Sequence, residues 1–185
     1  MAEIKKIGRF EGIFQSPTNG SKVTSLIILL HGWGADASDM FGLAPILCQI
    51  RAGCGFYAPN ALSTCSASPL GREWFDIQEG EKGAMMAFDD VNELIQGVLD
   101  EFSLPSSQVI LGGFSQGGMM TLTTGPSFDL AGLISFSGAL LTEQNLKQAS
   151  HSSPPILLIH GDLDDVVPST AVSYTHLRAH ETQFH

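Results

Sequence analysis

The sequence predicts an α/β fold with a mainly parallel sheet, and three observations support this prediction. Several short apolar runs, such as 26–30 and 156–159, are continuous rather than alternating, which is typical of strands covered on both faces. Segments with helical spacing of apolar residues separate these runs. The run at 109–113 also ends in glycines and leads directly into a helix-capable segment.

The elements alternate along the chain. The expected strands are 5–14, as an edge strand, 26–30, 56–59, 109–113, 130–136 and 156–159. The expected helices are 45–51, 85–102, 116–124 and 143–149. The second of these is the clearest, because its apolar residues recur at helical spacing with acidic residues mostly opposite. Residues 60–83 predict a long connection, which in a compact domain is usually functional or mobile.

Size and charge narrow the class of protein. A chain of 185 residues forms one sizeable core but not two comfortable domains. The formal net charge of −10 argues against nucleic acid or an anionic membrane as the main partner. The first ten residues lack the apolar segment of a signal peptide, and the run 26–30 is far too short to span a bilayer. The three cysteines lack metal-type pairing and fit a reducing compartment, so we expect a cytoplasmic protein.

Gly113, Ser115 and Gly117 form a G-x-S-x-G pattern between a predicted strand and a predicted helix. This pattern places a nucleophilic serine on a strained turn, where side chains at positions 113 and 117 would clash. The turn also directs the backbone N–H of Gln116 toward a developing oxyanion. The alternative is a glycine-rich turn whose serine only caps the helix. We favour the nucleophile, because both flanking elements are present.

Four ordered motifs resemble the phospholipase/carboxylesterase family, the α/β-hydrolase branch that includes bacterial carboxylesterases and acyl-protein thioesterases. They are Leu-His-Gly-Trp-Gly-Ala-Asp (30–36), Trp-Phe-Asp-Ile (74–77), Gly-Gly-Phe-Ser-Gln-Gly-Gly (112–118) and His-Gly-Asp-Leu-Asp-Asp-Val-Val-Pro (160–168). The resemblance implies an α/β-hydrolase fold with helices on both faces of the sheet, and it extends from about residue 25 to residue 168.

By this resemblance, Ser115 is the nucleophile and Asp164 the acid of a Ser-His-Asp triad, and the N–H groups of Trp33 and Gln116 form the oxyanion hole. Asp162 and Asp165 are the alternatives to Asp164, because aspartate caps loops freely. Trp74 and Phe75 could line a substrate pocket, or they could only pin the long loop to the body of the domain. His31 and His160 are expected to be structural histidines.

The histidine of the triad is absent from the recognisable part of the chain. In this fold it follows the acid, after a further helix and strand. Only 21 residues follow Asp164 (185 − 164), and their histidines are His176, His180 and His185. His176 and His180 have no evident third ligand for a metal. Residues 171–185 depart from the family pattern, so we expect an incomplete hydrolase domain over 1–170, with its last helix and strand missing or replaced by a tail.

The sequence therefore predicts a serine hydrolase of carboxylic esters or thioesters that needs no cofactor and no metal. The expected substrate is a small ester or thioester, with an acyl lipid as one candidate. A catalytically impaired ester- or lipid-binding module of the same fold is the alternative, and a peptidase or lactone hydrolase is a third. The acyl-chain length stays open at this point, as does the choice between a monomer and a homodimer.

Overall fold

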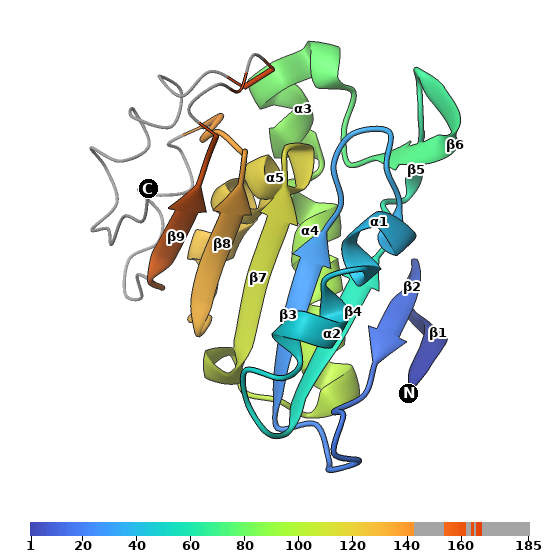
Figure 1. Cartoon of the computed structure of the whole chain (residues 1–185). Helices are drawn as coiled ribbons and strands as arrows, with labels where there is room; N and C mark the ends of the chain where they lie inside the picture. Colours follow the sequence, from blue (N-terminus) through green and yellow to red (C-terminus); the bar gives the residue numbers. More distant parts are fainter. Residues whose placement is uncertain (143–153, 162–163, 165, 168–185) are drawn as a thin grey trace.

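Seven strands form the main sheet of the computed structural model, which describes residues 1–142, 154–161, 164 and 166–167. Their order across this part of the sheet is β1-β2-β4-β3-β7-β8-β9 (Figure 1). The strands are β1 Ala2–Ile7, β2 Phe10–Gln15, β3 Ser25–Leu30, β4 Cys54–Pro59, β7 Val109–Phe114, β8 Gly132–Phe136 and β9 Ile156–Ile159. From β4 to β9 neighbouring strands are parallel, whereas β1 and β2 join antiparallel.

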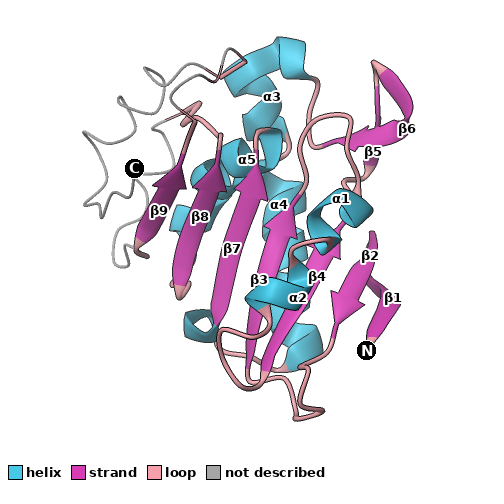
Figure 2. Ribbon diagram, in the orientation of Figure 1, coloured by secondary structure: helices cyan, strands magenta, loops and turns pink. Residues whose placement is uncertain are grey.

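Helices cover both faces of this sheet (Figure 2). They are α1 Ala37–Phe41, α2 Ala44–Leu47, α3 Gly80–Met86, α4 Phe88–Phe102 and α5 Gln116–Thr124. Figure 1 shows α1 and α2 on one face, with α4 and α5 on the other. Right-handed crossovers explain this division. The chain moves from β3 to β4 in one direction across the sheet, and then from β4 to β7 and β8 in the opposite direction. The predicted α/β-hydrolase architecture is confirmed.

The largest buried cluster lies between the sheet and α4. Val91, Leu94, Ile95 and Val98 on α4 are fully buried. Burial of each such side chain contributes about 1.5–3 kcal/mol, as an upper estimate. This packing explains why the periodicity of the sequence predicts α4 well.

Several boundaries differ from the sequence prediction. Residues 5–14 are not one edge strand but parts of two, since the chain turns between Ile7 and Phe10 and β1 pairs with β2. The predicted helix 85–102 divides into α3 and α4. The predicted helix 45–51 is the shorter α2, and α1 before it was not predicted. Asp36 and Asp39 form a capping box at the start of α1, a signal visible in the sequence.

The expected long connection 60–83 is mostly ordered secondary structure. A hairpin of β5 (Ser63–Cys65) and β6 (Ser68–Glu73) lies apart from the main sheet (Figure 1), and the turn Ile77–Glu79 and α3 follow it. Backbone hydrogen bonds to the loop after β3 hold this hairpin in place. The predicted helix 143–149 and the predicted tail 171–185 lie outside the described residues. No helix in the described ranges is long and apolar enough to cross a membrane.

Candidate active site

Ser115 lies on a strained turn between β7 and α5. Its backbone has φ 50° and ψ −113°, a conformation that costs a residue with a side chain about 1–3 kcal/mol. Gly113 and Gly117 are required here, because a Cβ on Gly113 would overlap the carbonyl of Gly117, and a Cβ on Gly117 would overlap the carbonyl of Leu30. The observed turn therefore has the sterics that the G-x-S-x-G spacing predicts.

Hydrogen bonds on both sides fix this turn. The Ser115 N–H donates to the Phe136 carbonyl of β8 at 2.8 Å, and the Ser115 carbonyl accepts from Met119 in α5 at 2.9 Å. The Ser115 residue is partly exposed. Gln116 is the first residue of α5, so its N–H has no partner within the helix. A partly exposed serine thus stands beside the positive end of a helix.

The loop after β3 is held by the end of β6. The Gly34 N–H donates to the Arg72 carbonyl, and the Arg72 N–H donates to the Ala35 carbonyl, both at 2.9 Å. The Trp33 side chain is 39% exposed, but its indole N–H donates to the Glu73 carboxylate at 2.8 Å. The predicted oxyanion loop therefore has a fixed backbone and a fixed tryptophan.

Trp74 and Phe75 are both buried and connect this loop to the serine turn. The Trp74 N–H donates to the Gln116 side-chain oxygen at 2.9 Å, and the Gln116 amide donates to the Phe75 carbonyl at 2.7 Å. The Trp74 indole N–H donates to the His31 carbonyl at 2.9 Å. Both aromatic residues pin the segment to the body. Both also line a cavity of about 250 Å³, together with residues of β5, α3 and the start of α4, but Ser115 does not line this cavity.

Asp164 follows β9 at the same edge of the sheet as Ser115. Because β7, β8 and β9 are parallel neighbours, the residues that follow them share this edge, two strand spacings apart. Asp164 Oδ1 accepts from the Val167 and Val166 N–H groups at 2.9 and 3.0 Å. These two bonds, with a smaller contribution from the Ser137 hydroxyl, lower the pKa of Asp164. The alternatives Asp162 and Asp165 lie outside the described residues.

Both histidines in the described ranges are engaged in the structure. His31 is fully buried, its Nε2 accepts from Ala61 at 3.0 Å, and its Nδ1 donates to the Gly32 carbonyl at 2.8 Å. Burial lowers the pKa of His31. His160 Nε2 lies 2.6 Å from the Val167 carbonyl and 3.6 Å from Asp164 Oδ2, and its Nδ1 is buried. Both His31 ring nitrogens are thus paired, and the remaining His160 nitrogen, Nδ1, is buried without a hydrogen-bond partner and is not accessible to a bound substrate. His151, His176, His180 and His185 lie outside the described residues.

Two residues near the site were missed by the sequence analysis. Glu73 is 7% exposed, and its contact with Trp33 has no sequence signal beyond a charged residue next to the Trp-Phe motif. Ser137 follows β8 with φ 48°, and its N–H donates to the Ile159 carbonyl at 2.8 Å. Its Phe-Ser-Gly context resembles the Phe-Ser-Gln-Gly at the nucleophile turn, and that repetition could have indicated it.

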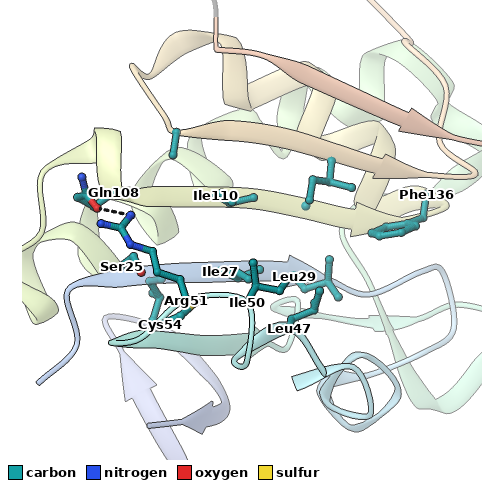
Figure 3. A pocket seen from close by; sticks show the side chains of 14 residues that line it. Ser25, Ile27, Leu29, Leu47, Ile50, Arg51, Cys54, Gln108, Ile110 and Phe136 are labelled. Carbon is teal, nitrogen blue, oxygen red and sulfur yellow. Dashed lines mark hydrogen bonds between the residues drawn. The ribbon is translucent and has the colours of Figure 1, made fainter. Parts of the chain in front are cut away.

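A second cavity, of about 170 Å³, lies away from this edge. Figure 3 shows it between the sheet and the segment that follows α2, lined mainly by apolar side chains such as Ile27, Leu47 and Ile110. A hydrogen bond of 3.1 Å from Arg51 to Gln108 lies at one end. Ser115 does not line this cavity.

Across the described ranges, no three His, Cys, Asp or Glu side chains come together as metal ligands.

Comparisons with known proteins identify the family of this chain. A family model described as phospholipase/carboxylesterase matches residues 15–182. Acyl-protein thioesterase 1 of Mycosarcoma maydis is 29% identical over 181 residues, covering 82% of this chain and 74% of the relative. Acyl-protein thioesterase 1 of Saccharomyces cerevisiae is 32% identical over 162 residues, covering 77% and 71%.

Solved structures give the same fold. The crystal structure of esterase PE8 is 33% identical, with a TM-score of 0.84, and the match covers 95% of this chain and 90% of that one. Fold and comparisons together define an α/β-hydrolase of the carboxylic-ester hydrolase class. The chain belongs to the phospholipase/carboxylesterase family. The matched range extends into residues 171–185, so the domain boundary at residue 170 stays a prediction.

Proposed function

We propose that this chain is a serine hydrolase of carboxylic esters or thioesters and that Ser115 is its nucleophile. The observation that carries the proposal is the strained, partly exposed Ser115 at the N-terminus of α5, with glycines where side chains cannot fit. A hydroxyl in this position can attack an acyl carbonyl carbon. N–H groups at the start of the helix can then stabilise, by hydrogen bonding, the negative charge that forms on the carbonyl oxygen.

In the proposed reaction, the Ser115 oxygen bonds to the acyl carbon and its proton passes to a histidine base. The N–H groups of Gln116 and Trp33 stabilise the oxyanion. The base returns the proton to the leaving alcohol or thiol as the carbon–oxygen or carbon–sulfur bond breaks. Water then attacks the acyl-enzyme and releases the acid and the free serine.

Asp164 is our proposed acid, and two observations support it. Its lowered pKa keeps the carboxylate ionised, and it lies at the same sheet edge as Ser115. An ionised carboxylate can hold an imidazole in one tautomer and stabilise its cationic form. The base itself is not assigned, because His31 and His160 are engaged elsewhere.

The test is release of p-nitrophenolate from p-nitrophenyl butyrate. We expect Ser115→Ala to reduce turnover at least about 10³-fold, whereas Ser103→Ala, an exposed serine at the end of α4, leaves it within about twofold. Equal turnover by the wild-type and Ser115→Ala proteins would refute the nucleophile. If the His31→Ala and His160→Ala variants keep the turnover of the wild-type protein, the base lies outside the described residues.

The engaged histidines favour one alternative, a catalytically impaired ester- or lipid-binding module. Such a module would bind a non-hydrolysable ether analogue of an acyl lipid but release no product from the ester. A series of p-nitrophenyl esters of increasing acyl length defines the substrate class in the same assay, because an apolar groove favours longer chains until it is filled. Faster cleavage of lactones or peptide amides than of any linear ester would point to the third candidate.

A further inference from the structure

Residues 72–75 contact both halves of the proposed oxyanion hole. On one side, the backbone of Arg72 pairs with Gly34 and Ala35, and the Glu73 carboxylate accepts from the Trp33 indole. On the other side, Trp74 and Phe75 make two hydrogen bonds with the Gln116 side chain. One short segment therefore joins the loop after β3 to the first residue of α5.

The contacts on the Trp33 side leave little freedom. The backbones of Gly71 and Gly34 lie so close that a Cβ on Gly71 would overlap the Gly34 carbonyl. The Trp74 indole adds a fourth hydrogen bond to this loop, by donating to the His31 carbonyl at 2.9 Å. The Trp33 N–H lies inside the stretch that these bonds fix, so its direction is set by the end of β6.

Glu73 needs a particular explanation. A glutamate is rarely buried to 7% exposure unless it is paired. The two partners of its Oε2 atom are the Trp33 indole N–H at 2.8 Å and the Ser66 hydroxyl at 3.3 Å. A bond from a neutral donor to a carboxylate is stronger than one to a neutral acceptor. The carboxylate thus restrains the indole of a tryptophan that is otherwise 39% exposed.

The Gln116 side chain has the matching role on the other half. It is fully buried, and it uses its oxygen as an acceptor and its amide as a donor toward adjacent residues of the segment. This pairing resembles one rung of a β-ladder and fixes the segment against the N-terminus of α5. The backbone N–H of the same residue is the second proposed oxyanion donor.

We propose that Glu73 and the side-chain amide of Gln116 are positioning residues, which set the spacing between the two oxyanion donors through residues 72–75. This proposal rests on the proposed function, because it presumes that Trp33 and Gln116 supply those donors. A donor displaced by about 1 Å can cost about 100-fold in rate, and loss of one donor costs about 10²–10³-fold in kcat. Loosening the segment should therefore lower kcat and leave substrate binding nearly unchanged.

The experiment measures kcat and KM for p-nitrophenyl acetate in Glu73→Ala and Trp33→Phe, which remove the two ends of the same hydrogen bond. We expect each to lower kcat about 10- to 100-fold with KM changed less than about threefold. The double variant should lose no more than the stronger single variant, because both remove one interaction. Gln116→Glu keeps the acceptor for Trp74 but loses the donor to Phe75, and should lower kcat similarly.

Matched controls separate positioning from folding. Ser66→Ala removes the other bond to Glu73 and should leave kcat within about twofold. Glu73→Gln retains an oxygen acceptor for the indole and should restore kcat to within about threefold of wild type. A trifluoromethyl ketone, which forms a tetrahedral oxyanion on serine, should lose affinity in Glu73→Ala by the same factor as kcat/KM. If Glu73→Ala fails to fold, Trp33→Phe gives the same comparison.

The outcomes distinguish a failure of the positioning roles from a failure of the proposed function. Active wild-type protein with unchanged kcat in Glu73→Ala and Trp33→Phe would overturn the positioning roles alone. Loss confined to KM, or additive losses in the double variant, would also overturn them. Wild-type protein without turnover and without reaction of Ser115 with a fluorophosphonate would overturn the proposed function, and the positioning roles with it.

Discussion

The nucleophile side and the acid side of the proposed site are built in different ways. The turn that carries Ser115 is held by contacts with four separate parts of the chain: β3, the segment that follows β6, β8 and α5. Among the described residues, Asp164 is bonded mainly within its own loop, to Val166 and Val167, with His160 and Ser137 beside it. The first arrangement depends on tertiary packing, and the second depends largely on a local turn.

This difference predicts how the two sides respond to substitution. A turn that buries glycine backbone against neighbouring strands cannot change without a cost in stability. A carboxylate in a local turn can change its chemistry while the turn survives. Substitutions on the acid side should therefore lower activity with little loss of stability, whereas substitutions on the nucleophile side should lower the stability of the fold.

The largest expected effect is on the acid side. We expect Asp164→Asn to lower kcat about 10³–10⁴-fold, because an amide cannot stabilise an imidazolium or hold its tautomer. The melting temperature should hardly change, since the side-chain carbonyl oxygen of the variant would still accept from the Val166 and Val167 N–H groups. Kinetics and calorimetry on one sample check both statements.

Asp164→Ala is the control for the turn. It removes the acceptor as well as the charge, so we expect the same loss of kcat together with a lower melting temperature. Full activity in Asp164→Asn would show that Asp164 only shapes the loop. Asp162 or Asp165 would then be the next candidates for the acid.

The nucleophile side should respond in the opposite manner. We expect Gly117→Ala to lower the free energy of unfolding by about 3 kcal/mol, because its Cβ would overlap the Leu30 carbonyl. Urea denaturation measures this change. Gly42→Ala is the matched control, since Gly42 has helical backbone angles and a Cβ there would meet only the Asp39 carbonyl, at an ordinary contact distance of 3.8 Å. A Gly117→Ala protein as stable as wild type would show that the turn relaxes easily.

A smaller effect concerns pH and the histidine that braces the oxyanion loop. Burial lowers the pKa of His31, so below about pH 6.5 the unfolded chain binds a proton that the folded chain excludes. The stability that neutral His31 contributes is therefore complete above about pH 6.5 and is lost progressively as the pH falls below that value toward the lowered pKa of the folded state. Urea denaturation between pH 7.5 and 5 should show this decline, and His31→Gln should reduce its slope. An unchanged slope in His31→Gln would show that other groups cause the decline.

The sequence predicts this fold well where a single pattern is sufficient. Continuous apolar runs indicate β3, β7 and β9, and periodicity indicates most of α4. The spacing of Gly113, Ser115 and Gly117 predicts the strained turn, because backbone sterics leave few alternatives. The prediction of a single strand over 5–14 was wrong because weak alternation does not reveal a short turn.

Contacts between distant segments could not be predicted in the same way. Nothing around position 73 indicates that its carboxylate meets Trp33, forty residues away in sequence. Likewise, G-x-S-x-G fixes the Gln116 backbone, but the pairing of its side chain with Trp74 and Phe75 depends on where the β5–β6 hairpin packs.

The most direct test of the central claim is covalent labelling of the intact chain with a fluorophosphonate, followed by peptide mass spectrometry. A strained serine beside an oxyanion hole should react, and the phosphonate should be found on Ser115, with no label in Ser115→Ala. Labelling that is absent from the wild-type protein, or that persists unchanged in Ser115→Ala, would contradict the assignment of Ser115 as the nucleophile.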